Sequence, residues 1–265
     1  MKEIILKSKK VVFDKLQGRH LSKFKGSGLD FKELREYIYG EDTKKIDWKI
    51  SAKFQKPYVK EFEEEREINI IIAVLGSGSI HFGTKRLKSE FISEIVGILG
   101  YSGVKYSDKV SLHIIADKIY SFKPTKQIKM IPYFIEKVYK FDYLGKDYEF
   151  DFISYLNKYK KSLLFLIGDF YKHPPIKKLK HETFVIWVRD KFEENPSSLG
   201  EIDLIDPVTL NKKHTFFEKE TLNKYKKEIK ALDKEFINYL KKEKIKFTKI
   251  YTDEEAYIKL AELVK

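Results

Sequence analysis

Two serines follow directly after the most apolar stretch of the sequence. The segment IIIAVLGSGSIHFGTK, residues 70–85, runs from β-branched residues into a Gly/Ser loop and then toward a helix. In α/β proteins, ligands bind at the carboxyl ends of strands and under helix N-termini. Ser77 and Ser79 therefore stand where the hydroxyl groups of a phosphate or metal site are found.

The loop does not complete a phosphate-binding motif. A P-loop requires G-x-x-x-x-G-K-[ST], whereas Gly78–Lys85 reads GSIHFGTK, so the glycine spacing matches but Thr84 and Lys85 stand in reverse order. A dinucleotide-binding fingerprint requires a third glycine where His81 stands. We therefore do not expect a nucleotide site at this loop.

The histidines do not indicate an enzyme. The six stand apart, at positions 20, 81, 113, 173, 181 and 214, with no zinc-helix spacing, and no G-x-S-x-G elbow occurs. His113 lies inside an apolar strand, where a hydrogen-bonded core residue is the simplest interpretation. His81 is near Ser77 and Ser79, but sequence proximity is a poor guide to triad geometry. We predict no catalytic residues.

The amino-acid composition further restricts the possible classes of protein. A chain of 265 residues with 42% hydrophobic content can bury a full core. It contains no cysteine, which excludes disulfides, thiolate catalysis and cysteine-ligated metals. The N-terminus lacks the apolar core of a signal peptide and no apolar run is long enough to cross a bilayer, so we expect a cytoplasmic protein.

The net charge of +13 raises the alternative of nucleic-acid binding. The lysines are spread along the chain and interleaved with acids, as in KKEIKALDKEFINYLKKEK, residues 226–244. A lysine-biased composition gives this balance without a dedicated surface. We keep nucleic-acid binding as an alternative and do not favour it.

Apolar and amphipathic segments alternate along most of the chain, after a polar, Gly- and aromatic-rich start. Near-continuous apolar runs predict strands covered on both faces, and the alternation predicts a mostly parallel, doubly wound sheet with helices on both faces. The predicted strands are 68–75, 110–116, 162–168 and 183–188, and the predicted helices between them are 85–101, 126–139 and 150–158.

The remaining segments predict peripheral elements. We expect an antiparallel edge strand at 118–124, a short strand at 201–207, a long helix packed on the sheet at 219–244, and a final strand and helix at 247–252 and 253–264. Thr252 followed by Glu255 fits a capping box at the start of the last helix.

The segment Gly18–Glu65 resembles the domain-of-unknown-function 58 family (DUF58). That family carries G-x-H-x-S, G-x-G-x-[ED]-F, L-R-x-Y, G-[DE]-D, I-D-W, S-A-[RK] and V-K-x-F-x-x-E in this order. The matching residues here are Gly18, His20, Ser22, Gly26, Gly28, Asp30, Phe31, Leu34, Arg35, Tyr37, Gly40, Asp42, Ile46, Asp47, Trp48, Ser51, Ala52, Lys53, Val59, Lys60, Phe62 and Glu65.

The resemblance implies a von Willebrand factor A-like α/β domain at 68–265, preceded by a family-specific, partly β segment at 1–67 packed on it. It extends to about Leu210 and includes a D-x-x-T turn, here Asp206 and Thr209. Around Trp48, expected to be a core anchor, Arg35, Asp42, Asp47 and Lys53 alternate in charge. We expect them to form a network that holds the segment on the sheet; a partner surface is the alternative.

The resemblance also implies a metal site that this chain has lost in part. Von Willebrand factor A-like domains hold a divalent cation with D-x-S-x-S, a later Thr and a later Asp. Here Ser77, Ser79 and Asp169 match, but Leu75 replaces the first Asp and Lys146 replaces the Thr. Because Mg²⁺ requires oxygen ligands, we expect a degenerate site with at most weak Mg²⁺ binding.

Two details of that site stay open at this stage. Lys146 or Lys85 is expected to pair with Asp169 and neutralise it. In a different alignment of the loops, Asp147 supplies an acid instead.

These expectations together describe a non-catalytic protein–protein interaction module. The resemblance implies, as partner, a MoxR-type AAA+ ATPase in a chaperone-like assembly system. The alternatives are a basic nucleic-acid-binding protein and, less favoured, a divalent-metal-dependent hydrolase, for which too few activating residues remain.

Overall fold

The computed structural model describes residues 1–15, 29–64, 68–197 and 200–263. The chain divides into two compact units, Met1–Leu21 with Asn69–Lys265, and Ser22–Ile68. Helix α1 (Lys2–Lys10) belongs to the larger unit because it packs on helix α3 (Lys88–Lys105). The expectation of one N-terminal segment over 1–67 is therefore corrected: its first helix folds with the residues that follow the segment.

A six-stranded sheet forms the centre of the larger unit. Its strand order is β10-β7-β6-β3-β4-β5, and all neighbours are parallel except β4 and β5. This confirms a mixed α/β fold with a mostly parallel sheet and an antiparallel edge strand. The strands are β3 (Asn69–Leu75), β4 (Lys109–Ile115), β5 (Ile119–Thr125), β6 (Leu163–Gly168), β7 (Glu182–Arg189) and β10 (Lys246–Tyr251).

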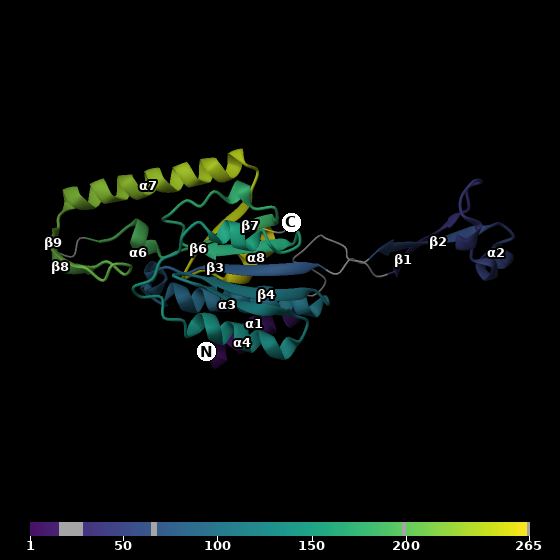
Figure 1. Ribbon diagram of the computed structural model, residues 1–265, viewed down its shortest axis with the longest axis horizontal. Helices are drawn as coiled ribbons and strands as arrows, with labels where there is room; N and C mark the ends of the chain where they lie inside the picture. The colour runs from purple at the N-terminus through teal and green to yellow at the C-terminus, as the bar shows by residue number, and fades with distance from the viewer. Residues whose placement is uncertain (16–28, 65–67, 198–199, 264–265) are drawn as a thin grey trace. The chain divides into compact units, whose positions relative to one another are not determined.

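Helices cover both faces of this sheet. Figure 1 shows α1, α3 and α4 on one side and α7 on the other. The helices that follow α1 in this unit are α3, α4 (Ile131–Tyr139), α5 (Phe152–Leu156), α6 (Lys191–Glu194), α7 (Lys219–Lys242) and α8 (Ala256–Leu263); short helical turns lie at Val11–Lys15, Gly78–His81, Ile128–Met130 and Ile176–Lys178.

The apolar runs form the strands for the expected reason. In β3 every residue after Asn69 is buried, and β6 is buried throughout, so both faces of these strands meet apolar neighbours. The four predicted central strands match β3, β4, β6 and β7 to within one residue at each end. Helix α3 begins three residues later than predicted, because a loop occupies residues 82–87.

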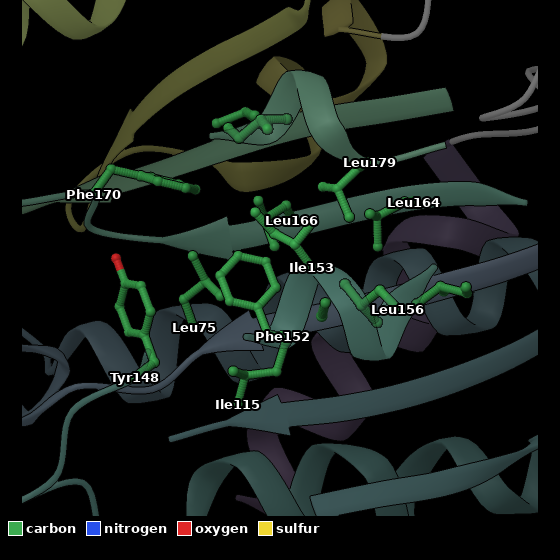
Figure 2. Close-up of a cluster of buried hydrophobic side chains, with 14 of the residues drawn as sticks. Leu75, Ile115, Tyr148, Phe152, Ile153, Leu156, Leu164, Leu166, Phe170 and Leu179 are labelled. Atoms are coloured by element: carbon green, nitrogen blue, oxygen red, sulfur yellow. The ribbon is translucent and has the colours of Figure 1, made fainter. Parts of the chain in front are cut away.

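One large apolar cluster lies on the α5 and α7 side of the sheet. Figure 2 shows part of it, with Leu75 among Tyr148, Phe152 and Leu166. Helix α7 contributes Phe236 and Leu240 to the same cluster, as its predicted packing on the sheet requires. Leu75 is 1% exposed, so the last residue of β3 belongs to the hydrophobic core.

Two peripheral expectations need correction. The predicted strand at 201–207 forms β8 (Gly200–Ile205), but it pairs with β9 (Lys212–Phe217) in a separate hairpin. The Thr252 hydroxyl does not cap the last helix; it donates to Asp190 Oδ2 at 2.8 Å. The capping box found in this part of the fold is Asp190 with Glu193, at the start of α6.

The smaller unit is a hairpin with a short helix between its strands. Strands β1 (Leu29–Glu36) and β2 (Tyr58–Glu64) pair in antiparallel orientation, and α2 (Trp48–Phe54) follows a 3-10 turn at Thr43–Lys45. Helix α2 begins at Trp48 because the Asp47 side chain accepts hydrogen bonds from the backbone N–H groups of Lys49 and Ile50.

Candidate functional site

The Gly/Ser loop at the end of β3 is built for close backbone packing. The Gly78 N–H donates to the Lys146 carbonyl at 2.9 Å. A Cβ at Gly78 would lie 1.9 Å from the Pro207 carbonyl oxygen, so only glycine fits there. The glycine spacing that resembles a P-loop therefore serves contact with two neighbouring loops.

The hydroxyl groups of the two serines form a chain of hydrogen bonds that ends at a carboxylate. Ser77 Oγ lies 2.5 Å from Ser79 Oγ, and the Ser79 hydroxyl donates to Asp169 Oδ2. Asp169 follows directly after β6, the neighbour of β3, so the two strand ends bring the three side chains together. The sequence-predicted trio of Ser77, Ser79 and Asp169 is thus one cluster.

A buried lysine completes this cluster. Lys88, the first residue of α3, is 0% exposed, and its Nζ lies 3.1 Å from Asp169 Oδ2 and 2.6 Å from Glu193 Oε1. The ammonium therefore bridges two carboxylates from different strand ends. A buried charge needs such partners, because isolation from water is otherwise very costly.

Glu193 is oriented by the capping box at the start of α6. One of its carboxylate oxygens accepts the backbone N–H of Asp190 at 2.8 Å, and the other accepts Lys88. Asp190 in turn accepts hydrogen bonds from the hydroxyls of Thr84 and Thr252. The Lys88 ammonium is thereby held by side chains that are themselves fixed by hydrogen bonds.

The electrostatics of the cluster favour an ionised Asp169. Burial alone would raise its pKa, but the Lys88 ammonium, the Ser79 hydroxyl and the nearby Arg189 guanidinium hold the pKa of Asp169 below its usual range. Arg189 is itself buried, pairs with Asp233 at 3.1 Å and stacks 3.7 Å from the centre of the Tyr171 ring. Positive side chains thus neutralise the carboxylate from within the protein.

The ammonium that reaches Asp169 is not one of those expected from the sequence. Lys146 Nζ lies 3.7 Å from Asp142, and Lys85 is exposed. The side chain of Asp147, the alternative acid, pairs with Lys172. These three residues therefore lie outside the cluster. Lys88 supplies the positive charge beside Asp169 that was expected from Lys146 or Lys85.

The side chains present do not fit a divalent metal. Mg²⁺ requires oxygen ligands in octahedral array, but Leu75 is a core residue, and the Lys88 ammonium contacts Asp169 Oδ2, the same oxygen that accepts the Ser79 hydroxyl. Within the described part of the chain, no group of three or more His, Asp or Glu side chains is arranged to hold a metal.

The motif residues of the smaller unit make local contacts. Arg35 holds Glu41 with two hydrogen bonds of 2.9 and 2.7 Å, and the Tyr37 hydroxyl donates to the Glu41 carbonyl. Asp42 accepts from the Lys44 N–H, and Ser51 Oγ donates to the Asp47 carbonyl. The glycine at position 40 has φ +103°, a turn conformation that favours glycine.

Other motif residues differ from expectation or fall outside the described ranges. Trp48, expected to be a core anchor, is 67% exposed, because it occupies the first turn of α2 on the solvent side. Lys53 is also exposed. Six motif positions lie outside the described residues: Gly18, His20, Ser22, Gly26, Gly28 and Glu65.

The sequence carried signals for the residues that were missed. Lys88 opens a helix in which fifteen residues are buried, so a lysine in its first turn has few routes to water. Glu193 stands three residues after Asp190 in D-x-x-E, a capping-box pattern. Arg189 ends an apolar strand.

Relatives with a similar sequence match this chain over a short region. Uncharacterized proteins from Mycobacterium bovis and Mycobacterium tuberculosis are 35% identical over 69 residues, which is 26% of this chain and 22% of their own length. The match therefore covers about a fifth of those relatives.

Solved structures with a similar arrangement are distant. A conserved hypothetical protein, BatB, from Bacteroides thetaiotaomicron has a TM-score of 0.44 at 12% identity, covering 74% of this chain and 97% of that one. An aerotolerance-related membrane protein from Bacteroides fragilis has a TM-score of 0.42 at 14% identity, covering 64% and 99%. Among the described helices of the present chain, none is long and apolar enough to span a bilayer.

A family model matches most of the chain. The model for "Protein of unknown function DUF58" covers residues 33–234, which include β1, α2, the Gly/Ser loop, Lys88 and Asp169. The motifs from Leu34 to Glu65 lie within that match, as the sequence resemblance predicts. The chain belongs to the DUF58 family.

Proposed function

We propose that this protein is a non-catalytic protein–protein interaction module with a von Willebrand factor A-like fold whose metal position is taken by its own lysine. The observation that carries the proposal is the Lys88 ammonium, fully buried between Asp169, which follows β6, and Glu193, in α6. A site filled by a fixed internal cation has no open position for a partner's carboxylate. Binding then uses other surfaces.

The same cluster supports a role without catalysis. The hydroxyls of Ser77 and Ser79 are engaged in the chain of hydrogen bonds to Asp169, and in the described chain no hydrogen bond joins either to His81. Nucleophilic catalysis requires a base within hydrogen-bond reach of the hydroxyl. A divalent-metal hydrolase requires metal-bound water, and Lys88 occupies the place of that metal.

The partner in this proposal is a MoxR-type AAA+ ATPase, in a chaperone-like assembly system. It follows from the family resemblance of the Gly18–Glu65 motifs alone. The basic surface around α2, where five lysines stand against one aspartate between residues 43 and 57, is compatible with an acidic protein partner.

Biolayer interferometry between the full chain and a nucleotide-free MoxR-type ATPase of the same organism tests both parts. We expect saturable binding that is unchanged between buffer with Mg²⁺ and buffer with a chelator. Absence of binding would contradict the partner, and loss of binding on chelation would contradict the metal-independent site. Divalent-dependent phosphatase or nuclease turnover that disappears in Asp169→Asn would contradict the non-catalytic role.

A further inference from the structure

The smaller unit carries an open apolar pocket beside the exposed indole of Trp48. The pocket has a volume of about 520 Å³ and is lined by Tyr37, Ile46, Trp48, Ser51, Ala52, Gln55, Lys56 and Pro57. This volume lies in the range of sites that hold one bulky group. Trp48 and Phe54 are 67% and 57% exposed, although aromatic residues of this size are usually covered.

The walls of the pocket are fixed by hydrogen bonds. Ser51 Oγ donates to the Asp47 carbonyl at 2.7 Å and accepts the Tyr58 N–H at 2.8 Å, which ties α2 to β2. The Tyr37 hydroxyl donates to the Glu41 carbonyl at 2.9 Å. A preformed apolar recess loses little conformational entropy when a side chain enters it.

The charge around the pocket is one-sided. Lys44, Lys45, Lys49 and Lys53 are exposed and have no ion pair within the described residues, whereas Lys56 pairs with Glu36 at 2.9 Å. The acidic groups of the same region are engaged: Asp47 and Asp42 cap helical turns, and Glu41 holds Arg35. Five lysines stand against one aspartate between residues 43 and 57, so the sequence around the recess carries an excess of positive charge.

We infer that this pocket binds a short acidic segment of a protein partner, with one large apolar side chain in the recess and carboxylates on the surrounding lysines. The basic region is short, because the sequence of β2 adds three glutamates in YVKEFEE. A long phosphate backbone would need a longer run of positive residues than the sequence provides at 44–56. Charge complementarity therefore favours a short acidic peptide over a nucleic-acid strand.

This inference rests on the interaction role proposed above and places it on a surface apart from the Lys88 cluster. Trp48 supplies the kind of anchor that dominates binding energy at protein interfaces. The lysines would speed association and make the affinity depend on salt.

The test measures binding of the full chain to fluorescein-labelled heptapeptides by fluorescence anisotropy. The probe has a central phenylalanine between acidic residues (DEDFDED). One comparison peptide has neutral flanks (NQNFNQN), another has a central alanine (DEDADED), and a ten-nucleotide oligo-dT strand represents nucleic acid. We expect saturable binding of the first probe, about ten-fold or more tighter than either comparison peptide and tighter than oligo-dT.

Variants assign this binding to the pocket. Trp48→Ala should weaken binding about thirty-fold, as for an anchor residue, and Ala52→Phe should weaken it by filling the recess without removing a contact. Reversal of two lysines on α2, Lys49→Glu with Lys53→Glu, should weaken it about ten-fold or more. The matched control, Lys230→Glu with Lys234→Glu on exposed positions of α7, should not.

Several outcomes would overturn the inference. They are absence of saturable binding up to millimolar peptide, equal affinity for the acidic and neutral probes, tighter binding of oligo-dT, and equal effects of the α2 and α7 reversals. Circular dichroism and the melting temperature of each variant confirm folding. If peptide binding is as predicted while no ATPase binds, the proposed partner is wrong and the inference about the pocket is supported. If the ATPase binds and the peptides do not, only the pocket is wrong.

Discussion

The cluster at the strand ends and the pocket beside α2 differ in what surrounds their charges. Lys88 and Asp169 are buried and satisfied by one another, with Glu193 and Ser79 completing the contacts. Trp48 is exposed, and lysines outnumber acidic residues in the sequence between residues 43 and 57. We accordingly propose that binding takes place at the pocket, where apolar area is open, and not at the cluster, whose charges are paired inside the protein.

Removal of the internal cation should give the largest effect on stability. Lys88→Met leaves Asp169 and Glu193 buried without their counter-charge, and breaking a buried pair in this way costs about 3–5 kcal/mol. Urea unfolding followed by circular dichroism measures the loss. The matched control is Lys146→Met, since the Lys146 ammonium forms its ion pair, at 3.7 Å, with the exposed Asp142; we expect a change below about 1 kcal/mol.

A second variant separates charge from packing in this experiment. Adding Asp169→Asn to Lys88→Met removes one of the two unpaired carboxylates, so part of the lost stability should return. If Lys88→Met is as stable as the wild type, or if the added change makes no difference, the account of Lys88 as a necessary internal cation is wrong.

A buried histidine in the sheet, His113, also predicts that the stability of the protein depends on pH. Burial lowers the pKa of His113 to about 4 from 6.5, so its neutral form is the one folded. As the pH falls from 6.5 toward 4, the unfolded chain takes up a proton that the folded chain does not, and stability declines. The expected share is about 3 kcal/mol, following the linkage between pKa shifts and stability.

Urea unfolding of the wild type and His113→Gln between pH 7 and pH 4 measures this share. Gln keeps hydrogen-bonding groups for Ser111 and Tyr155, which contact His113 at 3.3 and 3.2 Å, but it does not titrate. The variant should therefore lose less stability over this range. Parallel pH profiles for the two proteins would show that His113 is not the responsible group.

The Gly/Ser loop gives the next smaller effect. Gly78→Ala places a methyl group against the Pro207 carbonyl, and the backbone must shift to admit it. Overpacking of this kind costs about 1–3 kcal/mol. Thermal unfolding compares it with Gly40→Ala, where a Cβ meets no atom within 4 Å but φ is +103°. A Gly78→Ala protein with unchanged melting temperature would contradict the packing role of the loop.

The smallest effect on stability is expected at the pocket beside α2. Trp48→Ala removes an exposed side chain, so the free energy of unfolding should change by less than about 0.5 kcal/mol even though peptide binding is weakened. Chemical denaturation at neutral pH provides this value. A loss as large as that of Lys88→Met would mean that Trp48 is a structural residue.

Much of the larger unit could be predicted because its signals are local. Continuous apolar runs gave the central strands β3, β4, β6 and β7, and the period of apolar residues gave α7, whose predicted end at 244 lies two residues past Lys242. Ser77, Ser79 and Asp169 could be placed together because parallel strands end at one edge of a sheet. The pairing of β8 with β9 was missed, because the alternating pattern of β9 is weak and strand partners are set by tertiary structure.

The cation of the cluster could not be assigned from loop alignment. Lys146 and Lys85 stand in or beside the segments that align with the family's metal-site loops. Lys88 reaches Asp169 only because α3 starts beneath the strand ends. The exposure of Trp48 was likewise invisible, since a single tryptophan after Ile-Asp is compatible with a core anchor. The direction it faces depends on where the Asp47 cap starts α2.

Calorimetric titration of the chelator-treated protein with Mg²⁺ and Mn²⁺, alongside Asp169→Ala, tests the central claim most directly. The account predicts no saturable heat in the wild type at millimolar metal, and no change in its melting temperature, because Lys88 already fills the cation position. Saturable binding in the wild type that disappears in Asp169→Ala would contradict it and would show a working metal site at the Gly/Ser loop.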